Sequence, residues 1–324
     1  MIIQAMNTTT NPHPQAPAAN PPLLHGVAPI THLGVIRVEG DDAAKFIHSQ
    51  LTHDFSLLDL RTARLAAFCS AKGRMQASFI GFKRSATEIL LICSLDILPA
   101  TLKRLSMFVM RAKAKLTDAS AEFALYGLIG DATNNIADSN HSTWATAELN
   151  GAILVNLYPA VGLPRQLWIA PAGTPGPVGT ALTALQWQWT EVRSGVATLS
   201  APVFEAFVPQ MLNYESVGGV NFKKGCYPGQ EVVARSQFRG TLKRRAFVVH
   251  ADTAMAAGDE LFAADDDSQP VGTVVQAAPA PQGGFDAIVS AQLTAVEQGA
   301  LHHGASQGPA LQILPLPYAL LDDI

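Results

Sequence analysis

The chain has 324 residues, carries 22 Lys and Arg against 26 Asp and Glu, and is 48% hydrophobic. This length is enough to bury the cores of two or three domains, and a net charge of −4 gives no sign of a nucleic-acid-binding protein. No window approaches the roughly 20 apolar residues of a membrane-spanning helix. Three cysteines without C-x-x-C spacing exclude a disulfide framework and a zinc site built from cysteine pairs.

The first residues do not resemble a targeting signal. Residues 4–22 are mostly Asn, Thr, Pro, Gln and Ala and contain no Lys or Arg, so they match neither a signal peptide nor a transit peptide. Such a composition lacks the apolar surface needed to fold. We therefore expect a disordered tail over residues 1–24 and a cytoplasmic location.

Residues 34–116 alternate strand and helix patterns. Strands are predicted at residues 34–39, 64–80, 87–94 and 111–116, the last with a cationic side. Helices are predicted at residues 43–51, after an Asp cap, and from Ser94 or Asp96 onward, where Pro99 suits a first helical turn. His48 and His53 are five residues apart and cannot share a helix face, so we expect no metal site there.

The middle of the chain predicts a small α+β unit. Its predicted elements are strands at residues 121–129, 151–158 and 166–170, a short helix or loop within 131–150, and a helix at 179–191. Trp187 and Trp189 are two residues apart and therefore point to different faces of that helix. Either at least one of them faces a cleft or solvent, or both belong to the core.

Residues 221–235 contain a predicted tight turn next to a candidate reactive residue. Tyr227-Pro228-Gly229-Gln230 has Pro and Gly at the two central positions, as a type II turn requires. The apolar run Val232-Val233-Ala234 has high β propensity and predicts a strand that leads away from the turn.

Cys226 immediately precedes this turn and is the candidate reactive thiol. Lys224 and the neighbouring Lys223 favour the thiolate, the form that acts as a nucleophile or metal ligand. Glu231 either points at the sulfur or pairs with Lys224, and a small buried cysteine is the alternative reading of Cys226. The other two cysteines, Cys69 and Cys93, lie in apolar runs, where we expect buried, inert thiols.

The last 80 residues change in character. Short strands separated by Gly, Pro and Asp are predicted at residues 246–250, 259–262, 272–275, 285–290 and 311–314. Strands at this spacing predict a small antiparallel barrel.

The cations are concentrated in two segments. Residues 61–115 hold eleven Lys and Arg against two acids, and residues 221–245 hold seven against one. The two segments either share one basic face, whose partner would be a folate tail, RNA or an acidic protein, or form separate solvated surfaces.

The turn sequence resembles a known family. Lys224-Gly225-Cys226-Tyr227-x-Gly229-Gln230-Glu231, followed by Val233-Ala234-Arg235 and Gly240, is similar to the signature of the YgfZ family of folate-binding proteins. The resemblance extends from about Leu33 to about Thr273. Because that family is related in fold to the aminomethyltransferase of the glycine cleavage system, it implies an α+β, aminomethyltransferase-like multi-subdomain fold with a small C-terminal antiparallel β-barrel.

The resemblance also implies a ligand and a role. A reduced folate, tetrahydrofolate, would bind near Trp187 and the turn, and the residues so assigned are Lys224, Gly225, Tyr227, Gly229, Gln230, Glu231, Arg235 and Trp187, with Cys226 as the reactive thiol. The implied role is accessory: assembly or repair of iron–sulfur clusters in partner proteins, including tRNA-modifying enzymes. Three cysteines cannot hold a permanent Cys₄ cluster, which suits a helper protein.

Two other functions stay open. One is a folate-dependent aminomethyl or one-carbon transferase. The other is an RNA-binding module, which is disfavoured because aromatic residues are only 7% and do not interleave with the cations. We expect neither direct nucleic-acid binding nor a membrane partner.

The chain departs from the transferases in two places. No carboxylate between Arg61 and Phe82 matches the Asp with which those enzymes act on folate, which counts against group transfer. Glu191-Val-Arg193 exchanges the charges of their Arg-x-Glu motif, and Arg offers donors but no acceptor. Folate recognition therefore needs another acceptor or a different pose.

These patterns predict four parts. They are a tail at residues 1–24, a folate-binding-like domain made of residues 25–116 and 200–245, an α+β subdomain at 117–199, and a C-terminal barrel at 246–324.

Overall fold

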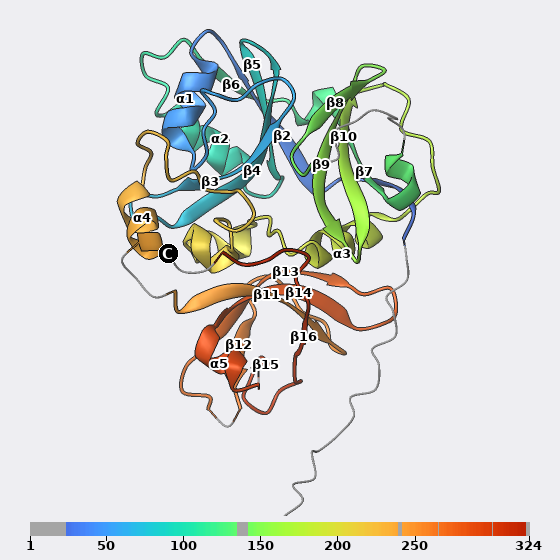
Figure 1. Ribbon diagram of the computed structural model, residues 1–324, viewed down its shortest axis with the longest axis vertical. Helices are drawn as coiled ribbons and strands as arrows, with labels where there is room; N and C mark the ends of the chain where they lie inside the picture. The colour runs from blue at the N-terminus through green and yellow to red at the C-terminus, as the bar shows by residue number, and fades with distance from the viewer. Residues whose placement is uncertain (1–23, 135–141, 239–241, 265, 300, 322–324) are drawn as a thin grey trace, which may run out of the picture.

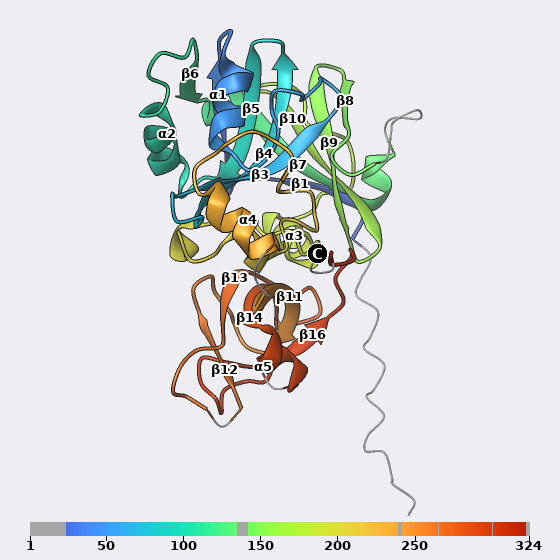
Figure 2. The same ribbon diagram turned by 60° about the vertical axis from the view of Figure 1, so that its left-hand side comes forward.

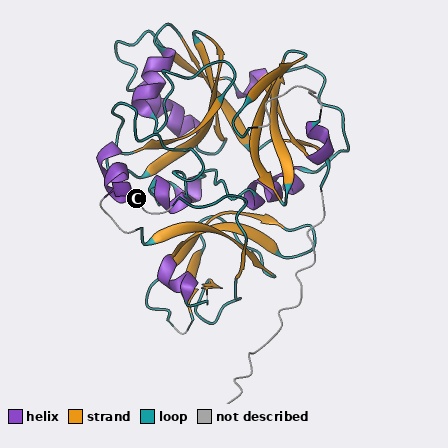
Figure 3. Cartoon of the chain, viewed as in Figure 1, coloured by secondary structure: helices purple, strands orange, loops and turns teal. Residues whose placement is uncertain are grey.

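Three antiparallel sheets make up the computed structural model, with short helices between them (Figures 1 and 3). The structure describes residues 24–134, 142–238, 242–264, 266–299 and 301–321. Residues 1–23 of the tail predicted at 1–24, and Gly240 of the family signature, lie outside the described residues, whereas Leu24 is buried. No helix in the described part is long and apolar enough to cross a membrane.

The first sheet has the strand order β3-β4-β5-β2-β6. Its strands are β2 (Leu33–Glu39), β3 (Ala63–Cys69), β4 (Met75–Ser85), β5 (Glu88–Ser94) and β6 (Lys115–Asp118). Helices α1 (Ala43–Gln50) and α2 (Leu98–Ser106) pack on one face, where Phe46, Ile47 and Leu105 join Ile36 and Phe79 in a buried cluster. Pro99 lies in the first turn of α2, as predicted.

Two predictions for this sheet are wrong in detail. The single strand predicted at residues 64–80 is a hairpin, β3 and β4, because residues 70–74 form a tight turn in which the Ser70 amide donates to the Arg74 carbonyl at 2.8 Å. The cationic strand predicted at 111–116 begins only at Lys115, since residues 107–114 continue the turn that ends α2. Apolar and charged residues do alternate from residue 111 to residue 114, but no neighbouring strand pairs with these residues.

The second sheet has the order β1-β7-β10-β9-β8. Its strands are β1 (Gly26–Pro29), β7 (Phe123–Ile129), β8 (Thr146–Leu149), β9 (Ala152–Ala160) and β10 (Leu163–Pro171), with single turns η1 (Ser120–Glu122) and η2 (Gly130–Thr133) beside β7. Neither β1 nor β8 was predicted. The stretch 131–150, expected to be a short helix or a loop, contains the end of η2 and β8, while residues 135–141 lie outside the described residues.

The third sheet has the order β15-β12-β13-β14-β11-β16 and curls into a partial barrel. Its strands are β11 (Arg244–Ala251), β12 (Glu260–Ala263), β13 (Gly272–Pro279), β14 (Phe285–Gln292), β15 (Leu301–His303) and β16 (Gln312–Leu314), with helix α5 (Leu293–Glu297) after β14. All five predicted strands exist, and the sheet encloses its own core around Leu261, Val274 and Val289. The α+β class and the small C-terminal antiparallel barrel are thus confirmed, the barrel being incomplete.

Helices fill the layer between the first two sheets and the third (Figure 2). They are α3 (Ala184–Arg193), η3 (Ala201–Val203), η4 (Pro209–Leu212) and α4 (Gln230–Phe238). One hydrophobic core runs through this layer and joins Val35, Leu167, Trp187 and Ile288 from different parts of the chain.

The strand predicted at Val232–Ala234 is wrong, because these residues belong to α4. Two Val residues favour a strand only weakly, whereas Glu231 and Arg235 form an i,i+4 ion pair at 2.9 Å that supports a helix. Val233 is fully buried, and its backbone carbonyl accepts a hydrogen bond from the side-chain amide of Gln210 at 2.7 Å. Tertiary packing therefore decides the conformation here.

Candidate functional site

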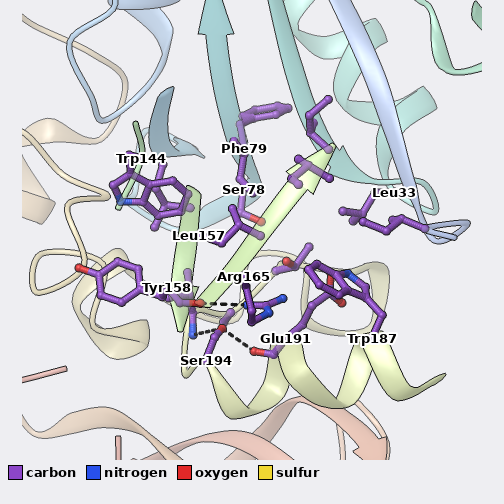
Figure 4. Close-up of a pocket in the computed structure, with 18 residues that line it drawn as sticks. Leu33, Ser78, Phe79, Trp144, Leu157, Tyr158, Arg165, Trp187, Glu191 and Ser194 are labelled. Atoms are coloured by element: carbon purple, nitrogen blue, oxygen red, sulfur yellow. Dashed lines mark hydrogen bonds between the residues drawn. The ribbon is translucent and has the colours of Figure 1, made fainter. Parts of the chain in front are cut away.

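An apolar pocket lies between the first and second sheets, with α3 along one side (Figure 4). Its cavity volume is about 50 Å³, which is room for a few water molecules, so a larger ligand enters only where lining side chains move. The walls are mainly apolar side chains from both sheets: Leu65, Phe79, Ile92, Leu157 and Leu167. A few polar side chains gather at the α3 end.

The helical repeat of α3 decides which residues reach this pocket. A capping box formed by Thr183 and Gln186 fixes the start of the helix. Trp187 and Glu191 are four residues apart and both line the pocket. Both tryptophans are buried and lie on different faces of α3, as expected if both belong to the core. Trp187 also forms part of the pocket wall.

Arg193 lies on the opposite face of α3 and does not line the pocket. Its guanidinium donates to the Asp286 carboxylate of the third sheet at 3.1 Å, and the Trp189 indole N–H donates to the same carboxylate at 2.7 Å. The exchanged motif therefore still brings one carboxylate to the pocket: Glu191 supplies the acceptor that Arg193 cannot.

Glu191 is held on both of its oxygens. Oε1 accepts from the Trp187 indole N–H at 2.9 Å, and Oε2 lies 2.8 Å from Nε2 of His32. Burial disfavours the imidazolium of His32, but the charge of Glu191 and the hydrogen bond outweigh it and raise the pKa of His32. A carboxylate oxygen has two lone pairs, so each can accept one further hydrogen bond.

Arg165 lies between Tyr158 and Trp187 in this pocket (Figure 4). Its guanidinium stacks 4.3 Å from the Trp187 ring, donates through Nε to Thr190 Oγ1 at 3.0 Å, and donates through Nη1 to the Tyr158 carbonyl at 3.3 Å. Burial lowers its pKa to about 10, against the opposing charge of Glu191. Arg165 is therefore a cation at neutral pH, and its guanidinium has more donors than these two bonds use.

The C-terminal segment packs against Tyr158, one of the residues that line the pocket. The Tyr318 ring packs edge-on against Tyr158 with centroids 5.5 Å apart, and its hydroxyl donates to the Gly195 carbonyl at 2.8 Å. Asn213 donates to the same hydroxyl at 3.3 Å. A segment beyond the third sheet thus fixes the position of a pocket residue.

The turn at residues 227–230 forms as predicted. Gly229 has φ +80°, and the Gln230 amide donates to the Tyr227 carbonyl at 3.2 Å, which is the pattern of a type II turn. The turn packs directly on the β3–β4 turn: a Cβ on Gly229 would lie 2.4 Å from the Ser70 carbonyl oxygen, and one on Gly73 would lie 2.9 Å from Val232. Two glycines thus allow the two turns to touch.

Lys224 is buried beneath this turn. Its ammonium donates to the carbonyls of His48 and Leu51, the latter at 2.8 Å, and lies 4.6 Å from the Tyr227 ring. Burial lowers its pKa to about 8. Lys224 therefore satisfies carbonyl groups at the end of α1, and the proposed Lys224–Glu231 pair is not formed because Glu231 pairs with Arg235.

The cysteines differ as the sequence indicated. Cys226 is exposed, whereas Cys69 and Cys93 are buried, and burial raises the pKa of both buried thiols to about 12. The alternative of a buried Cys226 is therefore wrong.

Two histidines lie near the end of α1, close to Lys224. His48 Nδ1 lies 3.0 Å from the Asp54 carboxylate, and its Nε2 would be 3.4 Å from a Cβ on Gly225. Burial lowers the pKa of His53 to about 4. No group of His, Cys, Asp and Glu in the described residues has the geometry of a metal site.

The two cationic segments meet in part. Burial and then the like charge of Arg74 lower the pKa of Arg244, which shows that these two side chains are close. The cations from Lys103 to Lys115, in contrast, lie in α2, the turn after it and the first residue of β6, which is the edge strand opposite β3 (Figure 1).

The candidate residues fall in two places. Trp187 lines the pocket, whereas none of the turn residues assigned from the resemblance does so. Sequence reasoning missed Arg165 and Glu191, which line the pocket, and His32, which contacts Glu191. The i,i+4 spacing of Trp187 and Glu191 could have indicated one of them; no sequence signal marks the other two.

Comparison with known proteins agrees with this fold. No protein-family model matches the chain. An uncharacterised protein of Haemophilus influenzae is 30% identical over 229 residues, which cover 70% of this chain and 74% of that protein. The tRNA-modifying protein YgfZ of Cronobacter sakazakii is 28% identical over 333 residues, covering 95% of this chain and 97% of its own length, and that of Edwardsiella ictaluri is 29% identical over 324 residues, covering 92% and 96%.

Among solved structures, aminomethyltransferase T of the glycine cleavage system from Bartonella henselae superimposes with a TM-score of 0.68. The match covers 92% of this chain and 87% of that protein at 16% sequence identity, so it concerns the fold. From the relatives over nearly its whole length, and from this shared fold, we conclude that the chain belongs to the YgfZ family.

Proposed function

We propose that the chain is a tetrahydrofolate-binding accessory protein of the cytoplasm that supports the assembly or repair of iron–sulfur clusters in partner proteins, tRNA-modifying enzymes among them. The observation that carries the folate part is the pocket at α3. Trp187 offers an indole, Arg165 offers unused donors, and Glu191 offers unused acceptor sites. A reduced pterin is a flat ring with a carbonyl acceptor and amino and ring N–H donors on its edges, and it needs this combination.

The pocket also supports an explanation for the exchanged charges. A pterin edge that donates hydrogen bonds needs a buried acceptor, and Glu191 meets that need from one turn after Trp187. Arg165 would then neutralise the carboxylate and donate to the pterin carbonyl. In this proposal the Glu191–Arg193 exchange moves the acceptor by two residues along α3 without removing it.

Titration with tetrahydrofolate tests this proposal. Binding should be followed by calorimetry and by tryptophan fluorescence, since Trp144 and Trp187 both line the pocket. Glu191→Gln should weaken the affinity by about 10- to 100-fold, because a charge-assisted hydrogen bond is lost. Glu122→Gln, in the ion pair with Arg37 and outside both the pocket and the turn, is the control for the loss of a carboxylate. Absence of saturable binding up to millimolar ligand would remove folate from the proposal.

The turn residues assigned from the resemblance are tested in the same way. If they contact folate, Gln230→Ala and Arg235→Ala will weaken binding as Glu191→Gln does. If only the pocket holds the ligand, these two variants will bind with the affinity of the unchanged protein.

Cys226 is the second part of the proposal. An exposed thiol near a cationic segment can act as a nucleophile or as a transient metal ligand. Cys226 should alkylate at neutral pH at least about 100-fold faster than Cys69 or Cys93, because it is exposed, whereas burial shields those two thiols and raises their pKa to about 12. Mass spectrometry of each cysteine measures this, and comparable rates would contradict it.

The cellular role is tested with Cys226→Ser. This variant should fold normally but fail to restore iron–sulfur enzyme activity in cells that lack the protein. Full restoration would show that the thiol has no part in the function. The names of the relatives, tRNA-modifying proteins, support the choice of a tRNA-modifying iron–sulfur enzyme as the reporter.

A folate-dependent aminomethyl or one-carbon transferase is the second candidate, favoured by the fold shared with aminomethyltransferase T. Glu191 is the one carboxylate among the residues lining the described pocket, and both of its oxygens already accept hydrogen bonds. Formation of methylene-tetrahydrofolate and ammonia from tetrahydrofolate and an aminomethylated thiol, with release of the free thiol, would favour this candidate over the accessory role if Glu191→Gln abolished it.

A further inference from the structure

The turn that follows α2 exposes an unusual group of apolar side chains. Met107, Phe108 and Met110 are exposed to 60%, 40% and 87%. Met110 also has φ +42°, a left-handed conformation that costs a residue with a Cβ about 1–2 kcal/mol. Three large apolar side chains within four residues are thus directed to solvent, and no part of the described chain covers them.

Exposed cations surround these apolar side chains on both sides in the sequence. They are Lys103, Arg104, Arg111, Lys113 and Lys115, and no Asp or Glu lies between Asp96 and Asp118. Lys113 lies 3.7 Å from the Asp41 carboxylate, with both side chains exposed. The other four form no salt bridge within the described residues. We call residues 103–115 the basic tip.

The charge of the whole chain is polarised in the same direction. Residues 246–324 contain ten Asp and Glu and no Lys or Arg, whereas residues 1–245 contain all 22 cations and 16 acids. Both views show α2 and β6, which flank the basic tip, at the opposite end of the molecule from the third sheet (Figures 1 and 2). An anionic surface would therefore attract the tip and repel the barrel, and so orient the molecule.

We propose that the basic tip docks reversibly on an anionic lipid bilayer, with Met107, Phe108 and Met110 inserted among the headgroups. Apolar side chains that enter the interface beside cations that meet anionic headgroups are the two components of peripheral membrane binding. The expectation of no membrane partner rested on the lack of a spanning segment, and a docking tip needs none. This contact goes beyond the proposed function and involves no residue of the pocket or the turn.

Other anionic partners fit the basic tip less well. A stable protein complex buries about 800 Å² on each side, far more than a single turn with three apolar side chains can supply. RNA recognition relies on aromatic platforms on which bases stack, and the tip has one aromatic residue, Phe108. Ser106 is its only uncharged polar side chain before Thr117, so directional hydrogen bonds are scarce.

Sedimentation of the full chain with lipid vesicles tests this proposal. Vesicles of phosphatidylcholine with about 30 mol% phosphatidylglycerol should bind the protein at low salt, and pure phosphatidylcholine vesicles should not. Binding should fall steeply as salt is raised from roughly 20 to 300 mM. Lys113→Gln and Lys115→Gln should each lower the partition coefficient about five-fold, and Met107→Ser with Met110→Ser should lower it at least ten-fold.

Matched controls distinguish binding through the basic tip from binding through any exposed cation or apolar side chain. Lys243→Gln removes an exposed cation elsewhere, and Leu57→Ser removes an apolar side chain that is 81% exposed; both should bind vesicles like the unchanged protein. All of these positions are exposed, so thermal melting should confirm folding of each variant. An environment-sensitive fluorophore on Met110→Cys, in the Cys226→Ser background, should shift to the blue on anionic vesicles.

Several results would overturn the proposal. They are the absence of binding to anionic vesicles at low salt, equal binding to neutral vesicles, and binding that the tip variants do not change. Binding of bulk tRNA that requires Met107 and Met110 would assign the tip to nucleic acid. Concentration-dependent dimerisation that the same variants abolish would assign it to a second copy of this chain.

Discussion

Replacing Gly229 by Ala should show that the glycine of the central turn is required for packing. Gly229 has φ +80°, and an added Cβ would lie 2.4 Å from the Ser70 carbonyl oxygen and 2.7 Å from the Gly73 Cα. Both atoms belong to the backbone of the β3–β4 turn and cannot rotate away. The two turns must therefore separate by about 1 Å to restore ordinary contact distances near 3.4 Å.

A second glycine in the same conformation separates the two costs. Gly173 has φ +87°, and an added Cβ would meet no atom within 4 Å. Gly173→Ala therefore reports only the left-handed strain of an L-residue, about 1 kcal/mol. Gly229→Ala carries that strain and a steric overlap of a further 1–3 kcal/mol, so its cost should be about 3 kcal/mol.

Urea unfolding followed by tryptophan fluorescence measures both variants, with equal m-values as the condition for comparing midpoints. Gly229→Ala should also change the labelling rate of Cys226, because the turn that carries the thiol has moved. If the two variants lose the same stability within about 0.5 kcal/mol, the contact between the turns does not restrict Gly229 and the reasoning fails.

Three further predictions concern buried charges. Lys224→Met removes the donor shared by two carbonyl groups at the end of α1 and should destabilise the fold by about 1–3 kcal/mol in urea unfolding. Arg193→Met leaves the buried Asp286 carboxylate with its Trp189 and His250 contacts but without the guanidinium, and should cost about 3 kcal/mol by the same assay. Because the pKa of His32 is raised in the folded state, its ion pair with Glu191 stabilises the fold fully below pH 6.5, and this stabilisation is lost as pH rises through the raised pKa. The difference in unfolding free energy between the unchanged protein and His32→Gln should therefore shrink above pH 6.5.

Each of these has a direct control. Lys223→Met, at the exposed neighbouring position, should be close to neutral, and an equal loss would deny the special role of Lys224. Arg235→Met breaks an exposed ion pair and should destabilise the fold by less than about 1 kcal/mol. Equal destabilisation by Arg235→Met and Arg193→Met would contradict the argument that burial makes the Arg193 pair matter more. A stability difference for His32→Gln that grows with pH would reverse the sign of the His32 argument.

Local sequence patterns were enough for the elements whose periodicity matches their burial. The strands of the third sheet other than β15, the strands β2, β5, β7, β9 and β10, and helices α1, α2 and α3 follow from alternation or helical spacing because each buries one regular face. The type II turn follows from Pro228 and Gly229, since those residues fix its backbone angles locally. The family signature supplied the aminomethyltransferase fold, which no periodicity could have given.

Tertiary structure decided the conformation of residues whose local preference is weak. Val232 and Val233 read as a strand, but the docking of their turn on residues 70–74 and the burial of Val233 make them a helix. A preference of under about 1 kcal/mol is readily outweighed by burying one Val side chain. The short strands β1 and β8 were missed for a related reason, because they exist through pairing with β7 and β9.

The sequence by itself determined that this protein has a reactive-looking cysteine in a rigid turn, a strand-rich C-terminal unit and the signature of its family. Only the tertiary structure decided which of Glu191 and Arg193 enters the pocket, because one helix lies between two surfaces and its 100° turn per residue sends the two side chains to opposite sides. It also brought Arg165, from β10, to the Trp187 ring and His32, from the segment before β2, to the Glu191 carboxylate of the same helix. Such convergence depends on the packing of distant segments, which residue order along the chain does not encode locally.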